Sequence, residues 1–451
     1  MLALSRVWIA ALVLGVGSAC SAATLDGTVA SGEPAAARDA GSLAEDAANV
    51  VPSSPTPDED AGVVAAPADD AAAPPTCGGG RCAIRVRQGR LERDGQAWVP
   101  KGAVVTGFVA PAAYLGGVYA QARAAWGPSL LTALRALGAD TIRFNVSVAA
   151  LDPTNAMPDG ALDAPAKAAY LDSIKAAVDL VEQHGMNAML TMQTGDVAGD
   201  PNEENRPGPA TARAWRVLAP VFANDPAVVL IAFNEPGYGG AATIDTDPSP
   251  WLEWRAGFGL LVDAIRQSGA SNVIVLDGLA TTSRVWRKNT DANLPSDPLG
   301  QLAFDIHPFP TDSSQHTKGG AAKLDYVQPA DIDHWLDGWC DAHACAATAF
   351  FTGIGNDAET ANCYDGRADG GPPVTSPEIV RTFANHFASK GIGLMLFAAD
   401  WKNRVFEDPS AASPAPTTFA GFKDCGGPKR MGPGAAMKAL WTTGTVPSPV
   451  P

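Results

Sequence analysis

The sequence lacks an excess of positive charge. Its 451 residues include 32 lysines and arginines against 48 aspartates and glutamates, which gives a formal net charge of -16. Proteins that bind nucleic acid usually present a basic surface to the phosphate backbone. The composition therefore argues against a nucleic-acid partner. It is compatible with an uncharged or basic substrate but does not select one.

Motifs for metals and organic cofactors are also missing. The 7 cysteines include no Cys-x-x-Cys pair and the 6 histidines are scattered, so a zinc site is an unfavourable interpretation. No glycine-rich phosphate loop follows the first predicted strand. We therefore expect neither a metal nor an organic cofactor.

Long hydrophobic runs are confined to the amino terminus. Arg6 precedes an apolar stretch, Val7 to Val16, that is too short to span a bilayer as a helix. A basic residue, a short apolar stretch and then small residues are typical of an export signal, which we place at residues 1–20. No second transmembrane candidate occurs, so contact with a membrane is expected only through a lipid anchor.

The residues Gly17-Ser18-Ala19-Cys20 resemble the cleavage box of a bacterial lipoprotein. Gly17 departs from that pattern, because an aliphatic residue is usual there. A cysteine directly after the cleavage site, followed by a long tether, favours lipidation of Cys20 and a place in the cell envelope. The alternative is simple cleavage after Ala19 and an extracellular protein.

Without Cys20, an even number of cysteines remains. In an oxidising compartment these six residues are expected to form three disulfides. The short separations suggest Cys77–Cys82 and Cys340–Cys345, which leaves Cys363–Cys425 as the long-range pair.

Residues 21–76 have little to bury. Ala, Asp, Pro, Gly and Ser dominate this segment, which has no hydrophobic periodicity. We interpret it as a disordered, partly extended linker that holds the next domain away from an anchor. From Cys77 the composition is that of a globular domain, placed at residues 77–446, with residues 447–451 as a tail. We expect a monomer.

The globular region alternates apolar strands with amphipathic helices, which is typical of a parallel sheet. Eight strands can be assigned, and all but one has a credible helix after it. Eight strands close a (β/α)8 barrel, whereas a doubly wound sheet usually has fewer, so we predict a (β/α)8 TIM barrel. The predicted strands are 98–105, 141–146, 188–192, 228–233, 273–276, 302–306, 349–352 and 394–398, and the predicted helices are 128–137, 166–183, 211–223, 251–267, 330–342, 377–389 and 435–441.

One apolar run, Val228 to Phe233, ends abruptly in Asn234-Glu235-Pro236. Consecutive apolar residues without alternation suit a strand that is buried on both faces. Pro236 removes a backbone donor and is expected to restrict Glu235 to extended geometry, so the strand ends with a carboxylate. In α/β barrels, chemistry takes place at this end of the strands. Glu235 is therefore the leading catalytic candidate, and a solvated turn glutamate is the alternative.

Other polar residues are predicted at the same end of the barrel. Arg143 lies in an apolar strand, where its charge is costly unless a carboxylate pairs with it. His307 follows a predicted strand, and Trp401 offers an aromatic face of the kind that stacks on sugars. The structural alternatives are a hydrogen-bonded histidine and a core tryptophan. The other candidates at strand ends are Gln193, Asp196, Asn234, Asp305, Asp357 and Asp400.

These segments resemble glycoside hydrolase family 5, the cellulase-like (β/α)8 glycosidases, over roughly residues 90–445. The resemblance implies hydrolysis of O-glycosidic bonds in a β-linked polysaccharide or oligosaccharide. Glu235 would be the general acid/base, Asn234 would hold the substrate 2-hydroxyl, and His307 would orient the cleft, with Arg143 and Trp401 in the substrate site. The segments that resemble the family are Leu91 to Gly95, Val99 to Gly102, Ala139 to Phe144, Trp215 to Pro236, His307 to Phe309, and Trp401.

One departure concerns the nucleophile. The family ends strand seven with a glutamate, and here Gly353 stands in that place, within Phe351-Thr352-Gly353-Ile354-Gly355. The strand-three histidine expected near Gln193 is also absent. A retaining glycosidase needs two carboxyl groups about 5–5.5 Å apart, and a glycine supplies none.

Three explanations remain open. A displaced carboxylate, from Asp357, Glu359 or Asp400, could act as the nucleophile. A carboxylate about 6.5–9.5 Å from the acid could instead activate water and invert the anomeric centre, with Asp196, Asp357 or Asp400 as the base. Finally, the protein could be a non-catalytic carbohydrate-binding pseudoenzyme on the cell surface, because a fold does not guarantee its usual function. An envelope interaction protein with a vestigial cleft is a weaker alternative.

Overall fold

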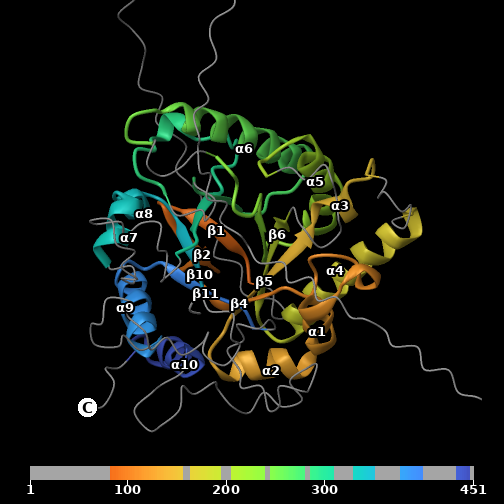
Figure 1. Ribbon diagram of the computed structural model, residues 1–451, viewed down its shortest axis with the longest axis horizontal. Coiled ribbons are helices and arrows are strands. Elements are labelled where there is room, and N and C mark those ends of the chain that lie inside the picture. Colours follow the sequence, from red (N-terminus) through yellow and green to blue (C-terminus); the bar gives the residue numbers. More distant parts are fainter. Residues whose placement is uncertain are drawn as a thin grey trace, which may run out of the picture. The chain divides into compact units, whose positions relative to one another are not determined.

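Eight parallel strands close into a barrel in the order β10-β11-β4-β5-β6-β7-β8-β9 (Figure 1). The predicted (β/α)8 fold is therefore confirmed. The strands are β4 (Lys101–Val105), β5 (Thr141–Ser147), β6 (Asn187–Gln193), β7 (Val228–Ile231), β8 (Ile274–Asp277), β9 (Leu302–Ile306), β10 (Cys345–Phe350) and β11 (Gly393–Phe397).

This computed structural model describes residues 82–155, 163–193, 205–238, 244–279, 285–308, 329–350, 376–399 and 433–446. All of them belong to one unit of the chain, residues 71–451. Within the described residues, no helix combines the length and the apolar character needed to cross a membrane.

Helices follow the strands along the chain and surround the barrel in Figure 1. The predicted helix at 330–342 is two helices, because Asp337 and Gly338 both adopt positive φ angles, 48° and 75°, which a helix cannot include. The helices are α1 (Gly117–Ala125), α2 (Pro128–Ala136), α3 (Val148–Leu151), α4 (Ala164–Gln183), α5 (Pro209–Phe222), α6 (Ser249–Gln267), α7 (Pro329–Leu336), α8 (Trp339–Ala342), α9 (Ser376–Ser389) and α10 (Pro433–Thr443), with short 3-10 turns at Ala112–Tyr114 and Asp291–Asn293.

Two predicted strand boundaries are wrong. The strand predicted at 349–352 is β10, which starts at Cys345, where small residues pair with β9 in the register Ala346↔Asp305. Alanines are poor strand formers, so only the tertiary pairing reveals them as a strand. The strand predicted at 98–105 begins three residues late, at Lys101, directly after Pro100.

The interior of the barrel has an apolar end and a polar end. Alternate residues of a strand point inward, so β9 contributes Ala303 and then Asp305, and β8 contributes Val275 and then Asp277. At the amino end the apolar residues join one cluster with the hairpin of β1 (Ile84–Arg87) and β2 (Arg90–Arg93). This packing leaves the carboxyl end of the barrel for polar side chains.

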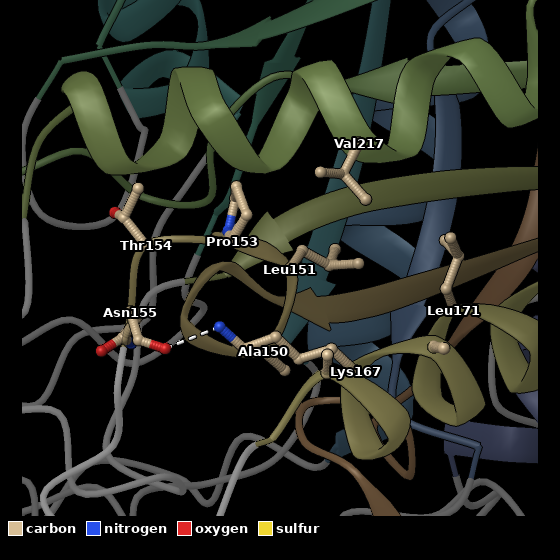
Figure 2. A pocket seen from close by; sticks show the side chains of 10 residues that line it. Ala150, Leu151, Pro153, Thr154, Asn155, Lys167, Leu171 and Val217 are labelled. Atoms are coloured by element: carbon tan, nitrogen blue, oxygen red, sulfur yellow. Dashed lines mark hydrogen bonds between the residues drawn. The ribbon is translucent and has the colours of Figure 1, made fainter. Parts of the chain in front are cut away.

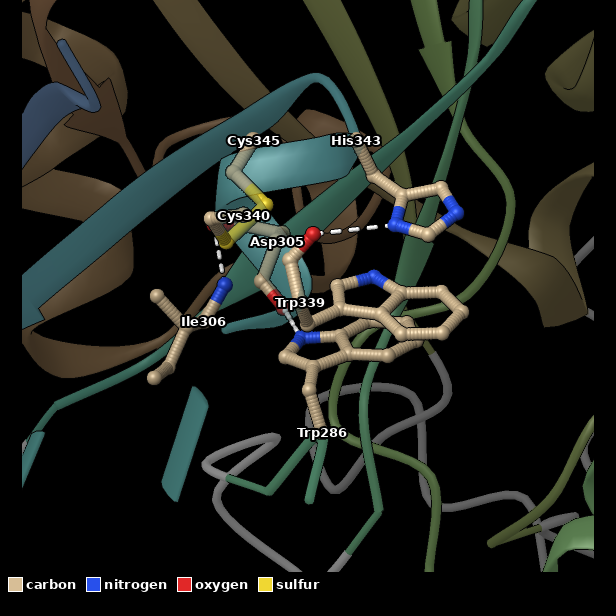
Figure 3. The surroundings of a disulfide bond; sticks show 7 residues. All are labelled: Trp286, Asp305, Ile306, Trp339, Cys340, His343 and Cys345. Carbon is tan, nitrogen blue, oxygen red and sulfur yellow. Dashed lines mark hydrogen bonds between the residues drawn. A yellow bond between two sulfur atoms is a disulfide. The ribbon is translucent and has the colours of Figure 1, made fainter. Parts of the chain in front are cut away.

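The predicted disulfide Cys340–Cys345 is confirmed, and it joins α8 to β10 (Figure 3). Beside it the Trp339 ring stacks on His343 at a centroid distance of 3.9 Å and on Trp286 at 5.3 Å. Cys82 is also disulfide-bonded. The other predicted pairings remain predictions, since Cys77, Cys363 and Cys425 lie outside the described residues.

Gly102 allows β4 to approach its neighbours closely. A Cβ atom on Gly102 would lie 2.0 Å from the carbonyl oxygen of Thr141 and 2.8 Å from the Met395 side chain. The oxygen belongs to the backbone of β5, which cannot move without breaking the ladder. We therefore expect Gly102→Ala to lower the free energy of unfolding by about 3 kcal/mol, as measured by urea denaturation.

The control is Gly116→Ala, at an extended residue with no atom within 4 Å of the added carbon. Its expected effect is below about 1 kcal/mol. Equal unfolding midpoints for the two variants would show that β4 is not held this tightly.

Candidate active site

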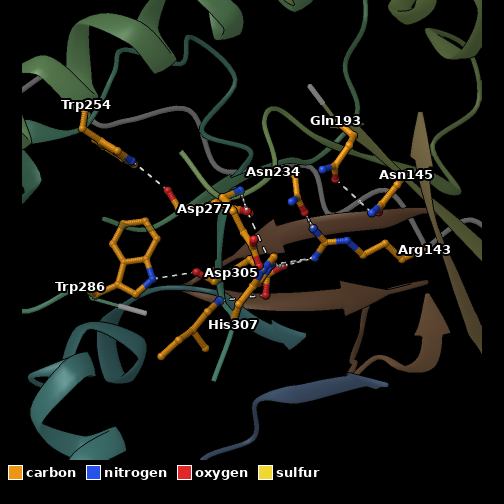
Figure 4. A network of polar contacts seen from close by, with 11 residues as sticks. Arg143, Asn145, Gln193, Asn234, Trp254, Asp277, Trp286, Asp305 and His307 are labelled. Atoms are coloured by element: carbon orange, nitrogen blue, oxygen red, sulfur yellow. Dashed lines mark hydrogen bonds and ion pairs between the residues drawn. The ribbon is translucent and has the colours of Figure 1, made fainter. Parts of the chain in front are cut away.

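Four charged side chains meet at the polar end of the barrel (Figure 4). Arg143 comes from β5, Asp277 from β8 and Asp305 from β9, and His307 follows β9. None is more than 2% exposed. Groups this buried must pair with one another, because water is not available to solvate them.

The guanidinium of Arg143 binds the surrounding side chains. Its Nη1 donates to Asp305 Oδ2, and its Nη2 donates to Asn234 Oδ1 at 2.9 Å. The expectation that Arg143 pairs with a carboxylate is therefore confirmed, and Asp305 is that carboxylate. Asn234 and Asp305, both predicted at strand ends, are brought to this site.

Glu235 adopts a left-handed backbone conformation, with a φ of 49°. The prediction of extended geometry before Pro236 is wrong at this residue. Its backbone N–H donates to Asp277 Oδ2 at 2.9 Å, a contact that holds the turn. A non-glycine residue at positive φ is strained, and such strain is often found at functional sites.

His307 connects Glu235 to the buried charges. Its Nδ1 lies 2.8 Å from Glu235 Oε1, and its Nε2 lies 3.1 Å from Asp305 Oδ2. The Glu235 side chain is 25% exposed, so its carboxyl group is anchored at one oxygen but still reaches solvent. Glu235 is thus the most accessible acid of this network.

The charge state of His307 follows from its neighbours. Burial by itself lowers the pKa of His307, but the charges of Asp277 and Asp305 outweigh burial and raise the pKa to about 10. Both ring nitrogens of a protonated histidine donate. Nδ1–H then donates to Glu235 and Nε2–H to Asp305. The 3.1 Å contact between Nε2 and Arg143 Nη1 joins two donors that share one acceptor.

The two buried aspartates differ. Burial raises the pKa of Asp277 to about 6, although the charge of His307 acts to lower it. Burial also acts to raise the pKa of Asp305, but the charges of His307 and Arg143 and their hydrogen bonds hold it below its ordinary value. Asp305 is therefore the permanent counter-ion, and Asp277 can take up a proton in mildly acidic solution.

Among the described residues, one group has the composition of a metal site, namely Asp277, Asp305 and His307. Arg143 Nη1 already binds Asp305 and supplies positive charge there. A protonated His307 has no lone pair with which to bind a metal. These residues therefore fit an ion-pair network better than a cation site, and we derive no metal chemistry from them.

Tryptophans of the outer layer hold the strand ends from behind. Each donates its indole N–H to a backbone carbonyl at the carboxyl end of a strand, and each is at most 1% exposed. The pairs are Trp215 with Ala232 at 2.8 Å, Trp254 with Asp277 at 2.8 Å and Trp286 with Asp305 at 2.9 Å (Figure 4). Asp277 and Asp305 are thus fixed through their backbones as well as their side chains.

Gln193, at the end of β6, accepts a hydrogen bond from Asn145 Nδ2 at 3.2 Å. A cavity of about 420 Å³ lies elsewhere, between the segment after β5 and helices α4 and α5 (Figure 2). No candidate site residue lines it, and the Lys167 ammonium group beside it donates to the carbonyl oxygens of Asp152 and Asn155. The cavity is therefore separate from the site.

Several predicted site residues are outside the described residues: Asp196, Gly353, Asp357, Glu359, Asp400 and Trp401. Conversely, Asp277 belongs to the site and was not predicted. It ends a strand that was predicted one residue short, in the sequence Leu276-Asp277-Gly278. The rule that polar residues at strand ends form the site would have selected it.

An accessible acid, an amide, a histidine and an arginine at the carboxyl ends of a (β/α)8 barrel define a glycosidase. The chain matches the family model for cellulase, glycosyl hydrolase family 5, over residues 115–365. It therefore belongs to glycosyl hydrolase family 5, as the sequence resemblance predicted.

Solved structures share this fold. The catalytic domain of an endoglucanase from Thermobifida fusca, in complex with cellotetraose, is 14% identical, and the match covers 80% of this chain and 97% of that chain with a TM-score of 0.51. A β-mannanase from Streptomyces thermolilacinus with mannohexaose is 20% identical and covers 72% and 87%, with a TM-score of 0.46.

The raised pKa of His307 predicts a dependence of stability on pH. The folded histidine keeps its proton up to about pH 10, whereas the unfolded one loses it near 6.5. Between these values the folded state binds the extra proton, so the free energy of unfolding should fall as the pH rises, by at most about 1.4 kcal/mol per pH unit. Urea denaturation of the wild type and His307→Gln at several pH values measures this slope.

The slope should be smaller in His307→Gln and unchanged in His184→Gln, because His184 binds only the Leu180 carbonyl of its own helix. Equal slopes in the wild type and His307→Gln would contradict the protonated state of His307.

Proposed function

We propose that this protein hydrolyses O-glycosidic bonds of a β-linked polysaccharide, with Glu235 as the general acid/base. The observation that supports this most strongly is the pairing of Glu235 Oε1 with His307 Nδ1 at 2.8 Å, while the side chain remains 25% exposed. The histidine fixes the carboxyl group, and the exposed part can reach a substrate. Both are required of a proton donor.

The anchored oxygen assigns the proton transfer to the other one. Because Oε1 accepts from His307, Oε2 is the atom that delivers a proton to the leaving oxygen. The resulting carboxylate is stabilised by the protonated His307, whose Nδ1–H remains in place. In the second half of the reaction the same oxygen takes a proton from water.

Arg143 determines how Asn234 meets the substrate. The amide oxygen of Asn234 accepts from Arg143 Nη2 at 2.9 Å. The amide nitrogen is a donor only, so it is left to bind a hydroxyl oxygen of the sugar. This arrangement suits the role of holding the 2-hydroxyl group. Trp401 is proposed to stack on a sugar ring in the same site.

The second carboxyl group must come from elsewhere in the chain. Of the carboxylates in the described network, Asp277 is 0% and Asp305 2% exposed, so neither can reach an anomeric carbon. The candidates remain Asp357, Asp400, Asp196 and Glu359. Proton NMR of the first-formed anomer distinguishes retention, with a nucleophile, from inversion, with a base, and single Asp→Asn and Glu→Gln variants then identify the group.

A non-catalytic carbohydrate-binding protein is the second candidate. The replacement of the family glutamate by Gly353 favours it. The structure adds a compatible observation: Arg143 has its counter-ion in Asp305, so the arginine does not depend on a strand-seven glutamate for charge balance. Binding of oligosaccharides without release of reducing sugar would support this alternative.

The localisation of the chain is a further part of the proposal. We propose export through residues 1–20 and anchoring through lipidated Cys20. Release of the protein from the membrane fraction in Cys20→Ser would support the anchor, and an unchanged distribution would contradict it.

We expect Glu235→Gln to lower the release of reducing sugar from β-glucan or mannan by about 10²–10⁴-fold, because the proton donor is lost. Substrates with an acidic phenol as leaving group need less protonation, so their loss should be smaller. The endoglucanase neighbour in complex with cellotetraose makes β-glucan the first substrate to test.

The matched control is Glu253→Gln. Glu253 is 57% exposed and pairs with Arg206 on the surface, so its neutralisation should leave turnover unchanged. Equal turnover of Glu235→Gln and the wild type would refute the acid/base assignment. A wild type that shows no turnover but is thermally stabilised by cellotetraose would favour the binding protein.

A further inference from the structure

We propose that Asp277 is the positioning residue of the acid: its carboxylate fixes Glu235 through the backbone and through His307. This inference rests on the proposed role of Glu235, and it gives a function to a buried aspartate that does not itself reach the substrate.

One carboxylate oxygen makes both connections. Asp277 Oδ2 accepts the backbone N–H of Glu235 at 2.9 Å and lies 3.6 Å from His307 Nε2. His307 in turn holds Glu235 Oε1 through Nδ1 at 2.8 Å. The contacts form a closed circuit from the Glu235 backbone to its carboxyl group. Its geometry depends on one acceptor atom that is placed by β8.

The circuit stabilises an unfavourable backbone. Glu235 has a φ of 49°, which places it in the left-handed region. Such a conformation costs of order 1–3 kcal/mol for a non-glycine residue and persists when its surroundings determine it. The hydrogen bond from its N–H to a charged acceptor is a strong one. Asp277 is itself held by Trp254, which donates to its carbonyl oxygen at 2.8 Å.

The charge of Asp277 also matters to its neighbours. The groups that face it are His307 and Asp305 from the β9 segment, Arg143 from β5 and Glu235 after β7. When all are ionised, the three carboxylates outnumber the two cations by one. Neutralising Asp277 removes one of the two buried negative charges that keep His307 protonated. A weakly protonated His307 is a poorer donor to Glu235, so the acid loses its anchor.

A pH dependence follows from this arrangement. The pKa of Asp277 is raised by burial to about 6. As the pH falls below this value, Asp277 takes up a proton and the charge on its acceptor oxygen is lost, while Asp305 remains ionised. The productive geometry of Glu235 should therefore be present above about pH 6 and weaken below it.

The test is an NMR titration of the full chain labelled at histidine, with the His307 signals assigned from His307→Gln. In Asp277→Asn the side-chain oxygen can still accept the Glu235 N–H, but the charge is gone. We expect the midpoint of His307 to fall by about 1–3 pH units. The matched control is Asp297→Asn, a carboxylate 1% exposed that pairs with Arg266, and this variant should leave the midpoint unchanged.

The activity readout is the pH profile of kcat and KM on β-glucan. In Asp277→Asn we expect kcat to fall with KM nearly unchanged, and the acidic limb near pH 6 to shift. If the wild type shows no turnover, the proposed function fails, but the NMR titration still tests the positioning role. An unchanged His307 midpoint in folded Asp277→Asn would overturn the inference.

A second measurement uses the wild type alone, in case the variant does not fold. The Asp277 carboxyl carbon should titrate near pH 6, and the His307 ring signals should change at the same midpoint. Titration of Asp277 without any response of His307 would also overturn the inference.

Discussion

The buried pair of Arg143 and Asp305 is the interaction on which the rest of the site depends. An arginine in a barrel interior is strongly destabilising without a counter-charge. With Asp305 bound to Nη1, the Nη2 group is available to orient Asn234, and the same carboxylate oxygen also receives His307 Nε2. The position of Glu235 follows, because the other nitrogen of His307 holds its carboxyl group.

The pair links the outer layer of the protein to its chemistry. Trp254 and Trp286 fix the backbones of Asp277 and Asp305 from the helical side, and the carboxylates act on the opposite side. The acid is thus placed by groups that do not involve strand seven. This independence explains how family membership is compatible with Gly353. The machinery for protonating a leaving group is complete among the described residues, whatever supplies the second carboxyl group.

Much of the fold could be predicted because barrel strands are short, apolar and regularly spaced. The strand at 302–306 was predicted with its correct bounds, and helix α4 within two residues. The amino end of β10 was missed because Ala346 and Ala347 have little preference for strands and are there only because of their pairing partners. For the site, Arg143, Asn234, Glu235, Asp305 and His307 were all predicted at strand ends, whereas Asp277 was missed by one residue at a strand boundary.

The sequence by itself determined the order of strands and helices, the family and the end of the barrel at which polar residues gather, because these depend on local periodicity and on residues adjacent in the chain. Only the tertiary structure decided which groups pair. Asp305 and Arg143 are 162 residues apart, and no local pattern shows that they share a proton-donor network with His307. Nor does Pro236 reveal the left-handed turn at Glu235. That turn depends on an acceptor supplied by β8, and contacts of this kind exist only once the barrel has closed.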